Sequence, residues 1–250
     1  MKASQLLISC TSLAFVACAG QTVSLHAGPS FASVHGGITV ADGGGALPPA
    51  SSVDSDLDLG DAEVSPFLQA QIDADGHRFR ISGLLVDTDG EGSLADDFGD
   101  VPAGSQVQTS LDFFALVGNY SYEVLREEHY RVGIGAQLGF YSLDVSATAP
   151  GSRESLDTQG LLPMPYLEAE AFYGDLTLGL SGGAMAGKFG DSDGRYLDLE
   201  AYARWLLDDR FDVRGGYRYL VLDGDGRATD RDFDADLDVR GFYVTAGVRF

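Results

Sequence analysis

The sequence from Arg240 to Phe250 reads R-G-F-Y-V-T-A-G-V-R-F. Apolar side chains occupy every second position of this stretch, which is the period of a β-strand with one apolar face. The positions between them are polar, aromatic or glycine. A tilted strand of about nine residues is long enough to cross a hydrocarbon layer. We therefore expect a membrane-crossing strand whose apolar face consists of Phe242, Val244, Ala246, Val248 and Phe250.

This pattern resembles the closing strand of Gram-negative outer-membrane β-barrels, which typically ends in Phe after alternating apolar residues. The chain is similar to the group of small barrels that includes the OmpA transmembrane domain, OmpX and OmpW. The resemblance implies an all-β, antiparallel, up-and-down transmembrane barrel in the cell outer membrane, reached through the periplasm. It also implies that the barrel assembly machinery inserts the protein and recognises the apolar face of the last strand as the insertion signal. Outer-membrane lipid would then surround the barrel.

The first residues carry an export pattern. Lys2 precedes an apolar core, and Ala17-Cys18-Ala19 supplies small residues where a signal peptidase cleaves. We expect residues 1–19 to be a cleaved signal peptide, residues 20–29 a short periplasmic segment, and residues 30–250 the barrel. The alternative is a lipoprotein signal in which Cys18 is acylated. Both cysteines of the chain, Cys10 and Cys18, lie in this segment, so a mature protein cleaved after Ala19 has no thiol for catalysis or metal binding.

The composition fits a barrel and argues against other classes. The chain has 250 residues, 44% of them hydrophobic, and 33 glycines, which suits one large domain. The formal net charge of −22 argues against nucleic acid as a partner, because phosphate would be repelled. A mean hydropathy of −0.01 is expected when lipid-facing and lumen-facing residues alternate along every strand.

Alternating segments recur from residue 31 to the end, and their number predicts about ten strands, within a range of about 8 to 12. Tight turns are expected near residues 74–76, 126–129, 173–175 and 207–210. Short periplasmic turns that alternate with longer outer loops are typical of outer-membrane barrels. The long, acidic outer loops are expected at residues 42–61, 87–109, 146–160, 188–195 and 223–236.

Aromatic residues cluster at the expected periplasmic strand ends. Rings with a polar group favour the level of the membrane interface, so we expect these residues to form an aromatic girdle. The members of this girdle are Phe79, Tyr122, Tyr130, Tyr173, Trp205, Phe211 and Phe250.

The alternation also places many charged residues on the inward face. A barrel of about ten strands has a lumen little wider than side chains can fill, so charges there must pair or stay hydrated. We expect a ladder of salt bridges that closes the lumen, and the alternative is a polar, selective pore. The expected lumen charges are Arg78, Arg80, Glu168, Glu170, Asp198, Glu200, Arg204, Arg214, Arg218 and Arg249.

The acidic loops offer carboxylates to divalent cations, because Ca²⁺ prefers several carboxylate oxygens. An EF-hand is excluded, since the twelfth position counted from Asp87 is Phe98 rather than Glu. Solvated, mutually repelling loops are therefore the preferred interpretation, with weak cation contacts as the alternative. The residues in question are Asp87, Asp89, Glu91, Asp223 and Asp225.

The histidines do not indicate catalysis. Barrel hydrolases need a histidine or an equivalent base near the outer rim or outer face. Here His26 precedes the first expected strand, His77 and His129 lie at periplasmic turns, and His35 is expected in the middle of a strand. We therefore expect a non-enzymatic barrel, without catalytic residues or cofactor.

Three functions remain open from the sequence. The preferred one is a barrel with a salt-bridged lumen and acidic surface loops, in a structural or surface-interaction role. The second is a narrow pore for small solutes, cationic because acidic loops favour cations at the mouth. The third is a soluble secreted β-protein, because soluble antiparallel sheets alternate as well.

Overall fold

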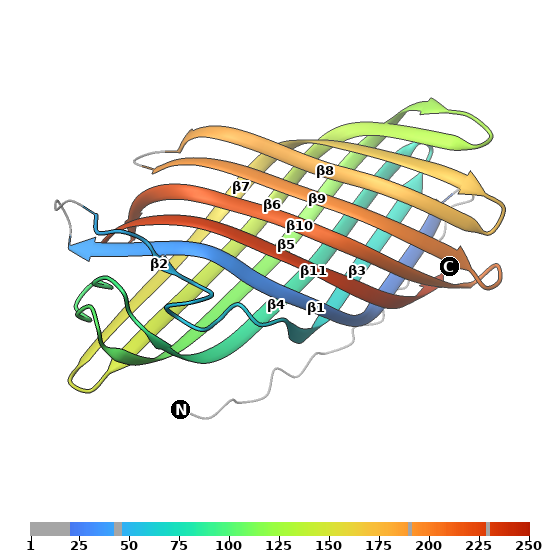
Figure 1. The fold of residues 1–250 in the computed structure, drawn as a ribbon. Helices are drawn as coiled ribbons and strands as arrows, with labels where there is room; N and C mark the ends of the chain where they lie inside the picture. Colours follow the sequence, from blue (N-terminus) through green and yellow to red (C-terminus); the bar gives the residue numbers. More distant parts are fainter. Residues whose placement is uncertain (1–20, 43–46, 190–191, 229–230) are drawn as a thin grey trace, which may run out of the picture.

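The computed structural model describes residues 21–42, 47–189, 192–228 and 231–250, and in these residues ten long strands close a ring (Figure 1). Each long strand pairs antiparallel with the next, and pairing of the first with the last closes the ring. Two-residue strand β2 pairs with the far end of β1. The strands are β1 Gln21–Asp42, β2 Ser51–Ser52, β3 Glu63–Ala74, β4 His77–Ser93, β5 Gln106–Arg126, β6 Tyr130–Ala149, β7 Ser152–Tyr173, β8 Leu176–Phe189, β9 Ser192–Leu206, β10 Phe211–Ala228 and β11 Arg231–Arg249.

The all-β antiparallel barrel and its four tight turns are confirmed. The turns join β3 to β4, β5 to β6, β7 to β8 and β9 to β10, at the positions expected from the sequence. Asp75 and Gly76 both have positive φ, 49° and 82°, which is the conformation of a two-residue hairpin turn. The described residues contain no helix that is long and apolar enough to span a membrane.

The N-terminal boundary differs from the expected one. Strand β1 begins at Gln21, so residues 21–29, expected as a separate periplasmic segment, are the first part of that strand. They pair with β3 on one side and with β11 on the other. The expected signal peptide and Cys18 lie outside the described residues.

Of the five expected long connections, those at residues 42–61 and 87–109 contain long connections, whereas most described residues of 146–160, 188–195 and 223–236 are strand. Strands β6 and β7 extend to residues 149 and 152, and β10 and β11 extend to residues 228 and 231. The acidic side chains of these stretches suggested loops, but the residues between them are apolar and bury a core, which favours strand. In the described part of the chain, longer connections remain only before β3 and between β4 and β5, at residues 47–62 and 94–105.

The barrel has two halves of opposite polarity. We call the half that carries the four tight turns the turn half, and the other the far half; they lie on the right and left of Figure 1. Along each strand of the turn half, apolar side chains point outward and polar ones inward. On β4, the outward positions of the turn half are Phe79, Ile81 and Leu85, and the inward ones are Arg78, Arg80 and Ser82. Further along the same strand, in the far half, the outward positions are Asp87, Asp89 and Glu91, and the inward ones are Leu84, Val86 and Thr88.

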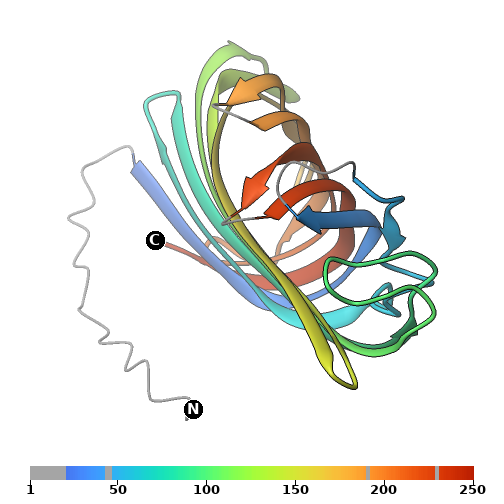
Figure 2. The same ribbon diagram turned by 90° about the vertical axis from the view of Figure 1, so that its left-hand side faces the viewer.

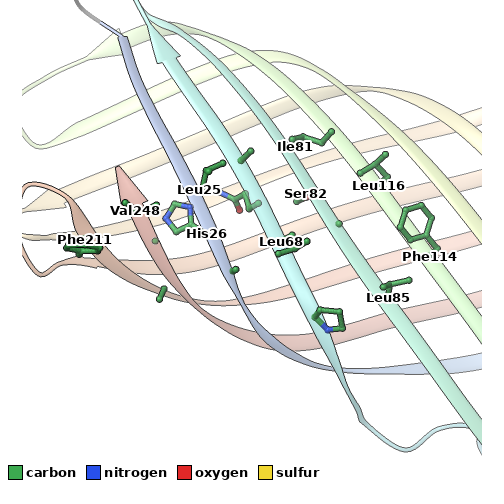
Figure 3. A pocket seen from close by; sticks show the side chains of 17 residues that line it. Leu25, His26, Leu68, Ile81, Ser82, Leu85, Phe114, Leu116, Phe211 and Val248 are labelled. Atoms are coloured by element: carbon green, nitrogen blue, oxygen red, sulfur yellow. The ribbon is translucent and has the colours of Figure 1, made fainter. Parts of the chain in front are cut away.

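The outward face of the turn half is a continuous apolar band. Figure 3 shows one groove of about 780 Å³ on this band, in which Leu25, Leu68, Ile81 and Leu116 from four neighbouring strands lie close together. At the turn end, the seven residues of the expected aromatic girdle are all exposed on the outward face. The residues expected to be the insertion signal, four on β11 and Phe250 directly after it, share this outward face.

The far half has an apolar interior and an acidic exterior. Its interior includes Ile38, Leu111, Val145 and Leu237, all buried. Two connections fold inward and complete this core. Residues 53–59 lie against the inner face of β4 and β5, where Thr109 donates a hydrogen bond of 2.6 Å to the carbonyl of Leu57. The buried side chains of these connections are Val53, Leu57, Leu59, Leu94, Phe98 and Val101.

Candidate functional site

The charged lumen of the turn half is the candidate site, and Glu168 is its centre. Alternation along β7 points Glu168 inward, where 2% of its surface is exposed. Its carboxylate accepts hydrogen bonds from Ser121 (2.5 Å) and from Arg131 Nη1 (2.5 Å). Arg78 and Arg80 of β4 each approach to 3.4 Å from the same carboxylate. Three guanidinium groups therefore surround one buried carboxylate, and the neighbouring Glu170 shares two of them.

A second cluster surrounds Glu200 on β9. Arg214 Nη2 donates to Glu200 at 2.7 Å, and Arg80 Nη1 lies 3.4 Å from the other oxygen. The Tyr243 hydroxyl also donates to this carboxylate. The Arg214 guanidinium lies 3.6 Å from the centre of the Tyr202 ring, a cation–π contact that stabilises a cation away from water.

A third cluster lies nearest the far half and is centred on Asp198. Arg218 binds Asp198 with two parallel hydrogen bonds, of 2.9 Å from Nε and 2.7 Å from Nη2. This fork geometry is the most specific arrangement for a guanidinium and a carboxylate. Gln137 of β6 donates a further bond of 2.8 Å from across the lumen. The ring of Tyr141 lies above this level, over Gly139, where an added Cβ would collide with the ring.

These contacts cross the lumen as well as joining neighbouring strands. Strand β4 reaches β7 and β9 through Arg78 and Arg80, β6 reaches β9 through Gln137, and the rings of Phe67 and Tyr243 stack at 4.3 Å. A buried charge without a partner costs several kcal/mol, whereas each carboxylate here has guanidinium, hydroxyl or amide partners. The arrangement places paired charges across the lumen of the turn half.

Most of the predicted lumen charges meet in these three clusters. Arg204 and Arg249 are different, because neither has an ion pair among the described residues, and Arg204 instead donates to the Thr177 hydroxyl at 3.3 Å. The sequence reasoning missed Arg131. It lies beside outward-facing Val132, so the alternation places it inward. The predicted set also lacked polar residues that link the charges, Ser121, Gln137, Tyr166 and Tyr243, whereas alternation along β9 does place the linking Tyr202 inward.

The acidic residues expected in loops lie instead on the outward faces of strands. Asp87, Asp89 and Glu91 follow one another on β4, and Asp223 of β10 pairs with Arg195. Across β4 to β7, Asp87, Asp112, Asp144 and Asp157 stand directly opposite one another. No group of three or more His, Cys, Asp or Glu residues in the described part of the chain is placed to hold a metal ion.

An apolar cavity of about 270 Å³ lies in the far half beside β7. Strand β7 pairs with β6 from Ser152 to Ala171, but it pairs with β8 only from Tyr166 to Tyr173. Pro163 and Pro165 lack the backbone donor that continued pairing would use. The β6–β7 and β8–β9 hairpins accordingly diverge at the far end (Figures 1 and 2). Inward Leu162 and outward Leu161 both line the cavity, so it reaches this unpaired edge.

Two histidines have partners at the turn end. His26 and Asp212 lie 2.8 Å apart and are both buried, and the His77 ring lies 2.9 Å from the Tyr120 hydroxyl. Both arrangements pair a ring nitrogen with a polar group that the barrel wall supplies. The contacts of His26 and His77 are therefore explained by a structural role in the barrel wall.

No protein-family model and no curated protein sequence matches this chain. Among solved structures, the outer membrane protease OmpT from Escherichia coli is 12% identical with a TM-score of 0.54, over 91% of this chain and 96% of that chain. Ail from Yersinia pestis is 12% identical (TM-score 0.39; 92% and 99% covered). A FadL homologue from Pseudomonas aeruginosa is 9% identical (TM-score 0.38; 93% and 90% covered).

These similarities concern the fold alone, because the identities are low and one of the proteins is a protease while others are not described as enzymes. They do not confirm the expectation of a non-enzymatic barrel. The similarity to OmpT, with a TM-score above 0.5, agrees with the closed antiparallel ring. The chain therefore has the fold of a small outer-membrane β-barrel.

Proposed function

We propose that the protein is an integral outer-membrane barrel with a closed, non-conducting lumen, which presents its far half at the cell surface. The observation that carries the proposal is the set of ion pairs across the lumen, from Arg78 and Arg80 to Glu168, Glu170 and Glu200. The apolar band, with its grooves for acyl chains, supports placement of the turn half in lipid. The charge network then stabilises the barrel and is not a route for solutes.

The far half adds a second barrier above the charges. Its interior is a packed apolar core, and the connection between β4 and β5 crosses toward β7 and β11. There the Asp100 amide donates to Glu154 at 2.9 Å, and Arg231 pairs with Asp100 and Glu154 at 2.8 and 2.9 Å. An ion entering from this side would have to displace both the connection and the core.

Planar-bilayer recording of the purified, folded protein tests this proposal. We expect no steady single-channel conductance from the unmodified protein. The double variant Arg80→Ala with Glu200→Ala removes a bridge across the lumen and should raise the frequency of brief openings. Steady conductance of the unmodified protein would contradict the closed lumen and support the narrow cation pore.

The acidic exterior of the far half suits cationic partners at the cell surface, and divalent ions would be attracted by its summed charge without a coordinating site among the described residues. The directly opposed Asp87, Asp112 and Asp144 support this part of the proposal, because they repel one another without a counter-charge. Thermal unfolding with and without millimolar Ca²⁺, compared at equal ionic strength, measures the effect. Equal unfolding temperatures with and without Ca²⁺ would show that these residues form an ordinary solvated face.

A second candidate function is the binding of a small apolar molecule in the far-half cavity. The favouring observation is that the cavity reaches the unpaired edge of β7, which gives a side entrance without opening the lumen. Fluorescence of an apolar naphthylamine probe should rise on binding, and Leu162→Asp should abolish the rise. Ser155→Asp, at an exposed outward position of β7 outside the cavity lining, is the matched control.

A further inference from the structure

Ser33, His35 and Asp54 form a hydrogen-bonded chain that the closed lumen does not use. The Ser33 hydroxyl lies 2.8 Å from His35 Nε2, and His35 Nδ1 bonds to Asp54. With the proton on Nδ1, this nitrogen donates to the Asp54 carboxylate and Nε2 accepts from Ser33. A hydroxyl bonded to a histidine that is oriented by a carboxylate is the arrangement of an activated serine nucleophile.

The local structure explains how these residues meet. Ser33 and His35 are two positions apart on β1, so they share the outward face that also carries Phe31; on this face Phe31 is 45% exposed and Ser33 is 9% exposed. Strand β2 pairs antiparallel with β1, with Ser52 opposite Gly37. The Val53 amide donates to the Gly36 carbonyl at 2.9 Å, which continues this alignment and brings Asp54 beside His35.

Two glycines fix this approach. Gly36 has a φ of +117°, which favours glycine, and a Cβ there would collide with the carbonyl oxygen of Asp236. A Cβ at Gly60 would collide with Asp54 Oδ1, so glycine at this position makes room for the carboxylate. The chain thus has a specific backbone arrangement around the carboxylate that orients His35.

A cation and an apolar surface adjoin the serine. Arg240 of β11 lies directly opposite Ser33, where a guanidinium can stabilise negative charge that develops on a carbonyl oxygen. One step toward the turn half, Phe31 lies opposite both Phe242 and Val64, and all three are exposed on the outward face. This is the border at which the outward face changes from apolar to polar, and therefore the level of the membrane surface.

We infer that Ser33, His35 and Asp54 are an ester-hydrolysing site for acyl esters held at the outer surface of the membrane. The Ser33 oxygen attacks the ester carbonyl carbon, and its proton passes to His35 Nε2. When the carbon–oxygen bond to the alcohol breaks, the alcohol oxygen takes that proton from Nε2. Water then attacks the acyl-serine, gives a proton to Nε2, and releases the carboxylic acid as the proton returns to Ser33. Asp54 acts as a positioning residue through His35.

The inference does not depend on the closed lumen, and a covalent label tests it directly. Purified, folded protein in phosphatidylcholine vesicles is treated with a fluorophosphonate, and the labelled peptide is identified by mass spectrometry. We expect label on Ser33, no label in Ser33→Ala, and labelling slowed about 10²–10⁴-fold in His35→Ala, the usual contribution of a general base. Ser142→Ala, which removes an outward serine of β6 without a histidine partner, is the matched control.

The substrate class is tested with p-nitrophenyl laurate and p-nitrophenyl acetate. Unmodified protein should hydrolyse the laurate faster, and Phe242→Ser should lower the ratio of laurate to acetate hydrolysis. Electrophoretic mobility before and after heating verifies that each variant is folded. Absence of label on Ser33, or equal labelling in folded His35→Ala, would overturn the site, and a preference for the acetate would overturn the lipid-like substrate.

Discussion

In the turn half, outward side chains are apolar and inward side chains are charged, whereas in the far half the exterior is acidic and the interior apolar. Nine of the ten long strands run through both halves, and β3 begins at Glu63 near the border between them, so the difference lies in the surroundings. Lipid outside favours apolar side chains and leaves polar ones to pair in the lumen. Water outside favours charge and leaves apolar side chains to form a core, as in a soluble barrel. In the proposed placement of the turn half in lipid, the change of polarity along each strand marks the membrane surface.

The largest effect is expected where a buried carboxylate is removed from the turn-half lumen. Glu168→Ala leaves Arg78, Arg80 and Arg131 without their shared partner and should lower the free energy of unfolding by about 3–5 kcal/mol. Urea unfolding in lipid vesicles, followed by the fluorescence of Trp205, measures the loss. Glu128→Ala, in the exposed turn between β5 and β6, is the control, and equal stability of both variants would refute a structural network.

The interior of the far half should respond as a soluble core does. Leu111 is fully buried, and Leu111→Ala should cost about 2–5 kcal/mol because it removes apolar contacts and leaves a cavity. Leu116 lies on the outward face of the same strand, where lipid can fill the space that Leu116→Ala creates. The second variant should be less destabilised in the same unfolding assay. The reverse order would show that the far half lacks a packed core.

Charge on the outward face should distinguish the two halves on a single strand. Ala136→Arg places a guanidinium in the apolar band of β6 and should cost about 2–4 kcal/mol if the position lies near the bilayer midplane. Asp144→Arg, on the same face in the far half, should be tolerated because it faces water between Asp112 and Asp157. Unfolding in vesicles compares the two. Similar losses of stability at both positions would indicate that the membrane surface lies further into the far half, beyond Asp144.

The smallest effect should be a gain in stability in the acidic exterior. Asp112 lies directly opposite both Asp87 and Asp144, and like charges in direct opposition are destabilising. Asp112→Asn should therefore raise the free energy of unfolding by about 0.2–1 kcal/mol at low salt, and the gain should shrink as salt screens the repulsion. Asp209→Asn, in a tight turn, is the control. A loss of stability on Asp112→Asn would indicate a bound counter-charge.

Much of the turn half could be predicted from the sequence because its signals are local. Alternation along β4 and β9 defines which residues point to lipid, and it separates Phe79 and Ile81 from Arg78 and Arg80. Hairpin turns such as Asp75-Gly76 depend on neighbouring residues only. The same approach failed in the far half, because stretches rich in acidic residues were predicted as loops. The buried apolar residues between the acidic ones show that these stretches are strands.

The sequence by itself determined that the chain forms a barrel, where its tight turns lie, which face of each strand is apolar, and which charged residues point into the lumen. Tertiary structure decided which charges pair, since Arg80 and Glu200 belong to strands far apart in the chain that meet across the lumen. It also decided the unpaired edge of β7 and the placement of Asp54 beside His35, which depends on the pairing of β2 with β1. A periodic pattern fixes the face on which a residue lies, but only closure and register of the sheet bring two faces together.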